Sequence, residues 1–277
     1  MKIDFYCPRW GSEHTGWPLF ATQVTQAGFT GVEVFPLGDT PNNAGMTDVL
    51  SDAGLSYILL HAELHEGKDF NRYKDALERN LYALLEYQSR DAKPQFIVSQ
   101  TGREYYSPAQ MAECFAICDR ISRESSVKII QETHRNKWSF AAHIVKDYLT
   151  EFPSLELALD FSHWVCVSES YLEDQDDAIE LAIKHGRHLH ARVGFPEGPQ
   201  VTDPRAPENE IALMHHLAWW DRWIAHLKEV GVERATITPE FGPYPYMPYS
   251  PFTTTPLASQ WEINCWIMRL LKERYES

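Results

Sequence analysis

The chain has 277 residues, of which 44% are hydrophobic and 23% charged, enough apolar sequence for a sizeable core and unlike a disordered chain or a coiled coil. With 25 Lys and Arg against 39 Asp and Glu, the net charge is −14, which argues against nucleic-acid and anionic-membrane partners. No run approaches the roughly 20 apolar residues of a membrane span. The opening MKIDFYCPRWG has no apolar signal segment, so we expect a cytoplasmic protein.

Cysteine usage agrees with a reducing compartment, because the five cysteines are an odd number and include no CxxC pair. Cys114 and Cys118 stand in the apolar stripe of a predicted helix, a position typical of small buried residues. We therefore expect no cysteine-based site.

Short apolar, β-branched runs alternate with longer segments of helical periodicity along the whole chain, which predicts parallel βαβ units. In chain order, the predicted strands cover residues 2–7, 31–35, 56–64, 95–100, 127–132, 156–161, 188–193 and 235–241. The predicted helices cover residues 18–28, 46–54, 71–88, 108–124, 140–152, 175–186, 208–231 and 256–276.

Eight strands, each followed by a helix, predict an α/β fold of the (β/α)₈ TIM barrel type, at about 35 residues per unit. A doubly wound sheet is the alternative, but the segment CPRWGSEHTGWP after the first strand has no GxGxxG pattern. The sequence shows no linker, low-complexity tract or strong internal repeat. We therefore expect a single barrel domain over residues 1–277.

Two predicted connections are longer than the usual loop of about 2–6 residues. They follow the seventh and eighth strands, at residues 194–208 and 242–256. Barrel enzymes build their sites at the C-terminal ends of the strands, so these loops lie where a functional site is expected. The alternative is that these two long loops extend the rim of the barrel without a functional role.

Polar residues stand at the C-terminal ends of four successive strands that are otherwise apolar. They are Glu132, Asp160, His190 and Glu240. Parallel barrel strands bring equivalent end positions around one mouth, so the four side chains can converge on one ion. Three carboxylates and an imidazole form a hard site that favours Mn²⁺ and also suits Mg²⁺, Co²⁺, Fe²⁺ or Zn²⁺. The alternative is that each acid pairs separately with an Arg or Lys.

Four segments resemble the sugar isomerase/epimerase superfamily of xylose-isomerase-like barrels. They are QETHRNKW (131–138), LDFSHW (159–164), HLHAR (188–192) and TPEFGP (238–243). The superfamily includes ketose epimerases, hydroxypyruvate isomerase, inosose dehydratase and, more distantly, endonuclease IV. The resemblance implies a metal held by a Glu, an Asp, a His and a Glu on strands five to eight, positions that fall on Glu132, Asp160, His190 and Glu240.

Other family positions carry over unevenly. The D-x-x-H spacing of the ketose epimerases is present as Asp160 and His163, and the resemblance implies that His163 touches a substrate oxygen. A His that bonds backbone at a helix start is the alternative. The epimerases also have a Glu six residues after the first metal Glu and an Arg six residues after the metal His. Trp138 and Pro196 occupy these positions, so the sequence lacks the two-glutamate proton relay of those epimerases.

Side-chain alternation along the strands predicts which residues flank the metal. Arg192, two residues after His190, is expected to point inward and to stabilise an oxyanion or hold the substrate, with a structural salt bridge as the alternative. His61 and Glu63, which end the third predicted strand, are expected to point the same way. Either can serve as the general base or bind hydroxyls, and pairing with a cation is the alternative for Glu63. His188, one layer deeper, is expected to support the site or fill the core.

Aromatic residues near the strand ends suit the C–H face of a sugar ring. They are Trp10, Trp164, Tyr244, Tyr246 and Tyr249. For the residues of the final long loop, a subunit interface is the alternative. Three tryptophans of the seventh predicted helix are expected in packing or in contacts of a homo-oligomer, namely Trp219, Trp220 and Trp223.

These features predict a divalent-metal-dependent isomerase or epimerase that acts on a small carbohydrate, a sugar, keto-sugar or related polyol ketone, through an enediolate. A lyase or dehydratase on the same site is the first alternative, because both reactions share the first proton abstraction. An abasic-site endonuclease needs more His ligands and a basic DNA track, which the sequence does not show. A catalytically silent sugar-binding subunit would be expected to lack a metal ligand, and here all four are present.

Overall fold

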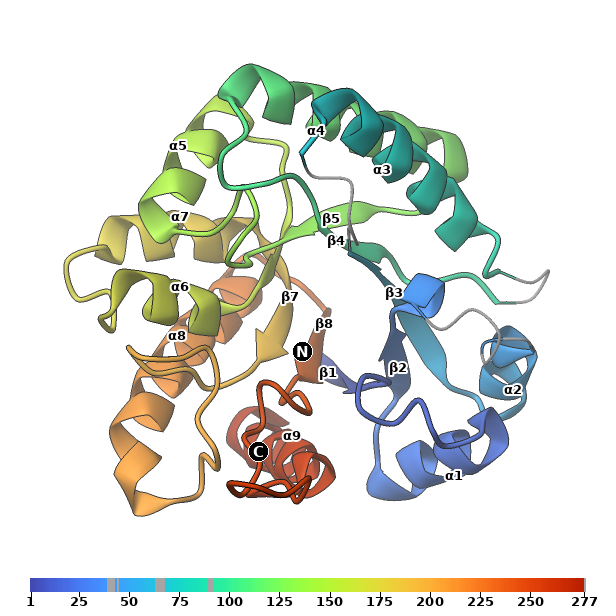
Figure 1. Ribbon diagram of the computed structural model, residues 1–277, viewed down its shortest axis with the longest axis vertical. Coiled ribbons are helices and arrows are strands. Elements are labelled where there is room, and N and C mark those ends of the chain that lie inside the picture. The colour runs from blue at the N-terminus through green and yellow to red at the C-terminus, as the bar shows by residue number, and fades with distance from the viewer. Residues whose placement is uncertain (39–42, 44, 63–67, 89–91, 277) are drawn as a thin grey trace.

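In the computed structural model, eight parallel strands pair in chain order, and β8 closes on β1 to form a barrel (Figure 1). The structure describes residues 1–38, 43, 45–62, 68–88 and 92–276. The strands are β1 (Lys2–Pro8), β2 (Gly31–Val34), β3 (Ser56–Ala62), β4 (Ile97–Gln100), β5 (Ile129–Glu132), β6 (Leu157–Leu159), β7 (Gly186–Ala191) and β8 (Arg234–Pro239). The predicted (β/α)₈ fold is confirmed.

The helices form a ring around this barrel (Figure 1). They are α1 (Trp17–Ala27), α2 (Met46–Asp52), α3 (Phe70–Leu85), α4 (Pro108–Ser125), α5 (Ala142–Glu151), α6 (Phe161–Ser168), α7 (Asp176–His185), α8 (Glu210–Glu229) and α9 (Gln260–Glu276), with short 3₁₀ turns η1 (Pro36–Gly38) and η3 (Pro207–Asn209). None of the helices in the described ranges has the length and apolar composition needed to cross a membrane.

The sixth unit differs from the prediction, because two helices follow β6 where the sequence predicts one. The predicted strand over 156–161 ends early, at Leu159, and α6 begins directly after Asp160. The Asp160 carboxylate accepts a hydrogen bond from the Ser162 backbone N–H at 2.9 Å and so caps the helix. An N-cap at the strand end therefore turns the chain into a helix immediately and places His163 in its first turn.

Alternate strand residues fill the inside of the barrel in layers. The lower layer is apolar and consists of Tyr6, Ile58, Val98, Ile130 and Ala158. His188 lies against it, 6.4 Å between ring centroids from Tyr6. Both nitrogens of His188 bond threonine hydroxyls of β8, at 2.8 Å and 3.1 Å, so His188 supports the layer above, as expected.

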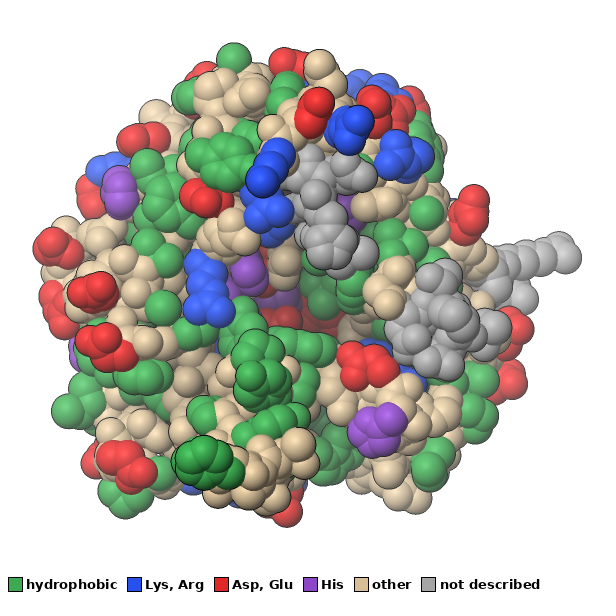
Figure 2. Space-filling model, viewed as in Figure 1, with side chains coloured by type: hydrophobic (Ala, Val, Ile, Leu, Met, Phe, Trp, Pro, Cys, Tyr) green, Lys and Arg blue, Asp and Glu red, His purple; other side chains and the backbone are tan. Residues whose placement is uncertain are grey.

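One step further toward the C-terminal strand ends, the inner layer becomes polar. The residues there include Glu33, Gln100, Glu132 and His190, each two positions beyond an inward-facing residue of the layer below. Figure 2 shows a hollow at the centre of this face, with His and acidic side chains inside it and Lys and Arg side chains on part of its rim.

Candidate metal centre and active site

Four buried side chains meet at the C-terminal end of the barrel. They are the four residues that the sequence singles out, Glu132, Asp160, His190 and Glu240, and each can offer one ligand atom within 4.8 Å of the other three. His190 Nδ1 lies 3.1 Å from Glu240 Oε2 and 3.6 Å from Glu132 Oε1. The structure therefore brings together side chains that lie more than a hundred residues apart in the chain.

The polar atoms of this group fit a divalent cation. His190 Nδ1 and Glu132 Oε1 are buried and have no hydrogen-bond partner among the described residues, and such atoms in a native structure call for an explanation. Burial raises the pKa of Glu132; His190 offsets part of this, and the nearby carboxylates of Glu240 and Asp160 add to the rise. A cation would relieve this repulsion and satisfy the open atoms, and the hard, oxygen-rich donor set suits Mn²⁺ or Mg²⁺.

Glu33 on β2 orients the histidine. Its Oε1 lies 3.0 Å from His190 Nε2, and its carboxylate is buried. With Nε2 donating to Glu33, Nδ1 is the His190 nitrogen that faces Glu132 and Glu240, and in the neutral ring it carries the lone pair that a metal would take, an arrangement common for metal-binding histidines. Glu33 was not among the predicted site residues, although a single acid within the apolar run GVEVF (31–35) is a signal visible in the sequence.

We expect the Glu33→Gln substitution to weaken metal binding by about 10–100-fold, because Glu33 orients a ligand without belonging to the four-residue group. A metal titration followed by calorimetry measures this. Glu262→Gln on α9 is the control for loss of one carboxylate and should leave the affinity unchanged. Equal affinities of wild type and Glu33→Gln would contradict the orienting role.

Arg192 points inward, as the strand alternation predicts. Its Nη2 lies 2.5 Å from Asp160 Oδ2 and 2.9 Å from Glu240 Oε2. Burial by itself would lower the pKa of Arg192, but the two carboxylates outweigh it and raise that pKa above its usual value. The guanidinium therefore stays charged and offsets part of the negative charge of the site.

His163 is fully buried in the first turn of α6. Its Nε2 lies 3.3 Å from Arg192 Nη2, and its ring centroid lies 4.0 Å from that of His134. The cavity above the four-residue group is lined by His134, and His163 is not among the lining residues. His163 therefore lies behind His134 as seen from the cavity, and its contact with a substrate oxygen stays a prediction.

The predicted orientation of His61 is wrong. In β3 the inward-facing residues are Leu60 and Ala62, which line the cavity, whereas His61 Nδ1 lies 3.0 Å from the Ser99 hydroxyl on β4. Ser99 in turn bonds Thr101, on the side of the strand that faces α4. Burial lowers the pKa of His61 to about 3, so it is neutral and structural. Glu63 lies outside the described residues.

The cavity over the four-residue group has a volume of about 620 Å³, within the range of small-molecule sites. Acidic residues and Gln100 form its floor, and Gln100 Nε2 donates to Glu132 Oε2 at 3.0 Å. Of the predicted aromatic residues, Trp10 and Tyr246 line the wall, in an edge-to-face pair with centroids 5.2 Å apart.

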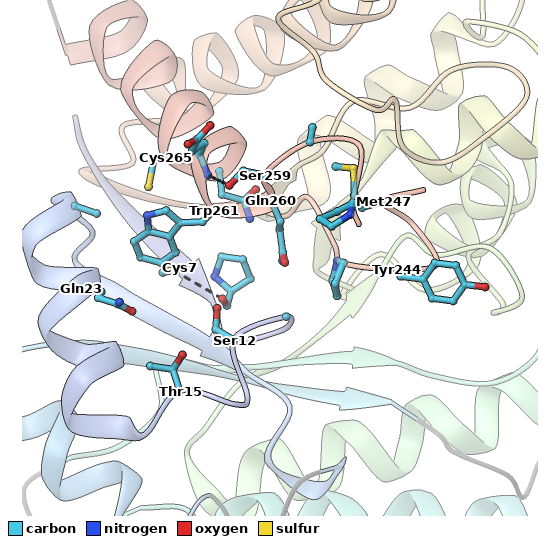
Figure 3. A pocket seen from close by; sticks show the side chains of 18 of the residues that line it. Cys7, Ser12, Thr15, Gln23, Tyr244, Met247, Ser259, Gln260, Trp261 and Cys265 are labelled. Carbon is cyan, nitrogen blue, oxygen red and sulfur yellow. Dashed lines mark hydrogen bonds between the residues drawn. The ribbon is translucent and has the colours of Figure 1, made fainter. Parts of the chain in front are cut away.

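The other predicted aromatics lie elsewhere. Trp164 is buried in the core, where its Nε1 donates to a backbone carbonyl. Tyr244 and Tyr249 stack on each other, with centroids 4.6 Å apart, and both border a second cavity. That cavity has a volume of about 1180 Å³ and is surrounded by side chains of β1, α1, α9 and the loops before the two helices, including Cys7, Gln260 and Trp261 (Figure 3). Among the described residues it holds no group of metal-binding side chains.

A glycine after β8 sets the position of Trp10. A Cβ atom added to Gly242 would lie 2.2 Å from the Trp10 indole, so the ring lies directly on this backbone. Both the N–H and the C=O of Gly242 bond the Gln200 side chain, at 2.7 Å and 3.2 Å, which holds the backbone in place. The Trp10 ring therefore packs directly on the backbone of Gly242, and only a residue without a side chain leaves room for it there.

We expect Gly242→Ala to destabilise the protein by about 1–3 kcal/mol, the usual cost of overpacking, and to displace Trp10 from the cavity wall. Urea unfolding and indole fluorescence measure these effects. Gly16→Ala is the matched control, because a Cβ there has open space. An unchanged midpoint and spectrum for Gly242→Ala would rule out this contact.

Comparisons with solved structures agree on the fold. A probable 3-DHS dehydratase from Bacillus anthracis matches over 99% of this chain and 100% of that chain, at 17% identity and a TM-score of 0.60. A 3-keto-D-glucoside 4-epimerase from E. coli matches over 98% of this chain and 100% of that chain, at 10% identity and a TM-score of 0.60. A D-psicose 3-epimerase matches over 99% of each chain, at 13% identity and a TM-score of 0.58.

The chain therefore has the fold of the xylose isomerase-like TIM barrels. A barrel of that description from Mycobacterium smegmatis, solved in complex with magnesium, is similar over 98% of this chain and 97% of its own, at 10% identity and a TM-score of 0.59. No protein-family model matches the sequence, and no curated protein matches it.

Proposed function

We propose that the protein is a divalent-metal-dependent isomerase or epimerase of a sugar, keto-sugar or related polyol ketone. The observation that carries the proposal is the buried group of Glu132, Asp160, His190 and Glu240, in which two facing ligand atoms have no hydrogen-bond partner among the described residues. We favour Mn²⁺ for this donor set. When bound, the ion would supply a Lewis acid that polarises a substrate carbonyl and makes the adjacent C–H more acidic.

His134 is our candidate for the group that moves the proton. Its Nδ1 lies 2.5 Å from the Arg135 carbonyl oxygen, which can only accept, so Nδ1 carries the hydrogen and Nε2 the lone pair. His134 lines the cavity, and the described residues provide no hydrogen bond to Nε2. Nε2 can therefore take a proton from one substrate carbon and return it to that carbon or its neighbour.

Arg192 is our candidate for stabilising the negative charge that forms on a substrate oxygen when the proton leaves. It lines the cavity, and one arm of its guanidinium already holds Asp160 and Glu240. The other arm ends in Nη1, which has no partner among the described residues. A fixed cation in a site shielded from water can lower the energy of such a charged intermediate.

Solvent deuterium exchange tests this function. The Mn²⁺-loaded protein is incubated in D₂O with a panel of ketoses and keto-sugar acids, and NMR detects deuterium at the carbon next to the carbonyl together with any isomer formed. We expect both for at least one member of the panel. A product lighter by one water would favour a dehydratase, and neither deuterium nor product across the panel would contradict the proposal.

We further propose that the partner is a small carbohydrate and not a nucleic acid, because four acidic side chains line the cavity (Glu13, Glu33, Glu132 and Glu240) in a chain of net charge −14. A duplex with an abasic site should therefore stay intact with the protein and Mn²⁺, as measured on a denaturing gel. Efficient metal-dependent nicking would favour the endonuclease alternative.

A further inference from the structure

Next to the cavity, against its lining residue Tyr246, lies an arginine that forms no ion pair among the described residues. Arg135, in the loop after β5, is half-buried and has no acidic side chain within ion-pair distance among the described residues. Its guanidinium lies 5.2 Å from the ring centroid of Tyr246. Arg72, Arg79 and Arg269 likewise form no ion pair among the described residues, but their side chains are exposed and solvated, whereas Arg135 is half-buried. A half-buried charge beside the cavity therefore points to a ligand.

The surroundings of Arg135 offer hydrogen-bond donors. The Tyr246 ring also packs against Arg192, at 4.8 Å from its guanidinium carbon, so two guanidinium groups approach one ring. Because an arginine can only donate, His163 Nε2 accepts from Arg192, and the hydrogen of the neutral His163 ring is on Nδ1. Arg192 Nη1 and His163 Nδ1 are buried donors with no partner among the described residues, and of the two residues only Arg192 lines the cavity.

The floor and this part of the rim carry opposite charge. The floor holds Glu33, Glu132 and Glu240, which would repel an anionic group and suit the carbonyl and hydroxyl oxygens of a substrate chelating a cation. The side of the cavity near Tyr246 holds Arg192 and borders Arg135. A ligand that matches both regions has vicinal oxygens at one end and an anionic group at the other.

We propose that the substrate of this site is a keto-sugar acid, whose carboxylate is bound at the cavity rim by Arg135 with Tyr246 beside it. The proposal rests on the proposed function, because that function places the chelating end of the substrate on the floor. Two arginines line the cavity: Arg192 is shared with Asp160 and Glu240, and Arg9 donates to backbone carbonyls, so the carboxylate is assigned to Arg135 beside Tyr246. One guanidinium matches a monoanionic carboxylate in charge and geometry, whereas a phosphate dianion would call for further cations.

Three probes that share one carbon skeleton separate the possibilities: D-fructose, D-fructuronate and D-fructose 6-phosphate. The D-tagatose series with the same three end groups provides a second skeleton. Calorimetric titration with and without MnCl₂ gives the affinities. We expect the wild type to bind a uronate at least about tenfold more tightly than the matching neutral sugar, as one charge-assisted hydrogen-bonded contact provides.

The Arg135→Gln variant should lose this preference while its affinity for the neutral sugar stays the same, and Arg135→Lys should retain part of it. Arg205→Gln removes the same charge from a loop on the same end of the barrel, where Arg205 pairs with Asp203, and should keep the preference. Equal affinities for uronate and neutral sugar in both series would overturn the proposal. So would a preference for the phosphate, or an equal loss of both affinities in Arg135→Gln.

These affinities are independent of turnover, so the subsite and the proposed function can fail separately. Tight uronate binding that depends on Arg135, without metal binding or deuterium exchange, would leave the subsite in place and remove the isomerase. Metal binding together with deuterium exchange on neutral ketoses alone would leave the isomerase in place and remove the subsite.

Discussion

We expect replacement of Glu240 by Gln, or of His190 by Ala, to abolish the tight divalent-metal binding proposed for this group of four residues. Each substitution deletes a donor from a group in which all four ligand atoms lie within 4.8 Å of one another. The loss of affinity should exceed the about 10–100-fold expected for Glu33→Gln, because Glu33 only orients a ligand. Elemental analysis of the purified variants and a Mn²⁺ titration measure the effect.

A carboxylate at the other end of the barrel provides the control. Glu156 pairs with Lys128 and Arg187, so Glu156→Gln removes an acid without touching the metal group and should retain stoichiometric metal. Ligand binding to the folded state raises stability, so a chelator should lower the melting temperature of the wild type and of Glu156→Gln but not that of Glu240→Gln. Stoichiometric metal in both the Glu240 and the His190 variant would refute the assignment.

The barrel and the four converging residues could be predicted because both follow from periodicity. Eight apolar runs alternate with helical segments, and in a barrel the ends of parallel strands meet by geometry alone. Locating the strand ends correctly was therefore enough to predict that Glu132, His190 and Glu240 lie together. Asp160 was placed by the same rule, although the predicted strand ran on to residue 161; the N-cap hydrogen bond that its carboxylate accepts from the Ser162 N–H ends β6 earlier.

Strand alternation places side chains only when one residue of the strand has a known direction. For β7 the metal-type His190 supplied that reference, and Arg192 was placed correctly. For β3 nothing in the sequence distinguished the two faces, since the run SYILLHA is apolar on both. In the structure Leu60 points inward and His61 points outward. Shifting the assignment of the strand by one residue exchanges the inward and outward side chains along its whole length.

The residues that lie behind or between the ligands could not be predicted from the sequence, for a different reason. Glu33 acts through a contact with His190 across the barrel, 157 residues away in the chain, and no spacing rule connects them. Tyr246 and Tyr244 stand two residues apart in one loop, yet only Tyr246 lines the site. An irregular loop has no fixed period, so its side chains cannot be assigned to a face.

Exchange of the substrate's α-hydrogen with solvent will depend on both the metal group and His134. Glu132→Gln should abolish exchange, because without carbonyl polarisation a C–H next to a ketone is far too weak an acid for an imidazole. His134→Gln keeps an amide that can donate to the Arg135 carbonyl but has no basic nitrogen. It should slow exchange by about 10²–10⁴-fold, the usual contribution of a positioned base, while metal content stays the same. NMR in D₂O under single-turnover conditions measures both rates.

Comparison of the two variants separates proton transfer from the alternative chemistry. If His134 moves the proton, His134→Gln loses exchange and turnover together, and its metal affinity and uronate affinity remain those of the wild type. Turnover with complete retention of the α-hydrogen would instead indicate a metal-assisted hydride shift, which needs no base next to the carbon. That result would leave Glu132, Asp160, His190 and Glu240 as the metal group, because the shift needs the same polarised carbonyl, and would exclude His134 from the chemical step.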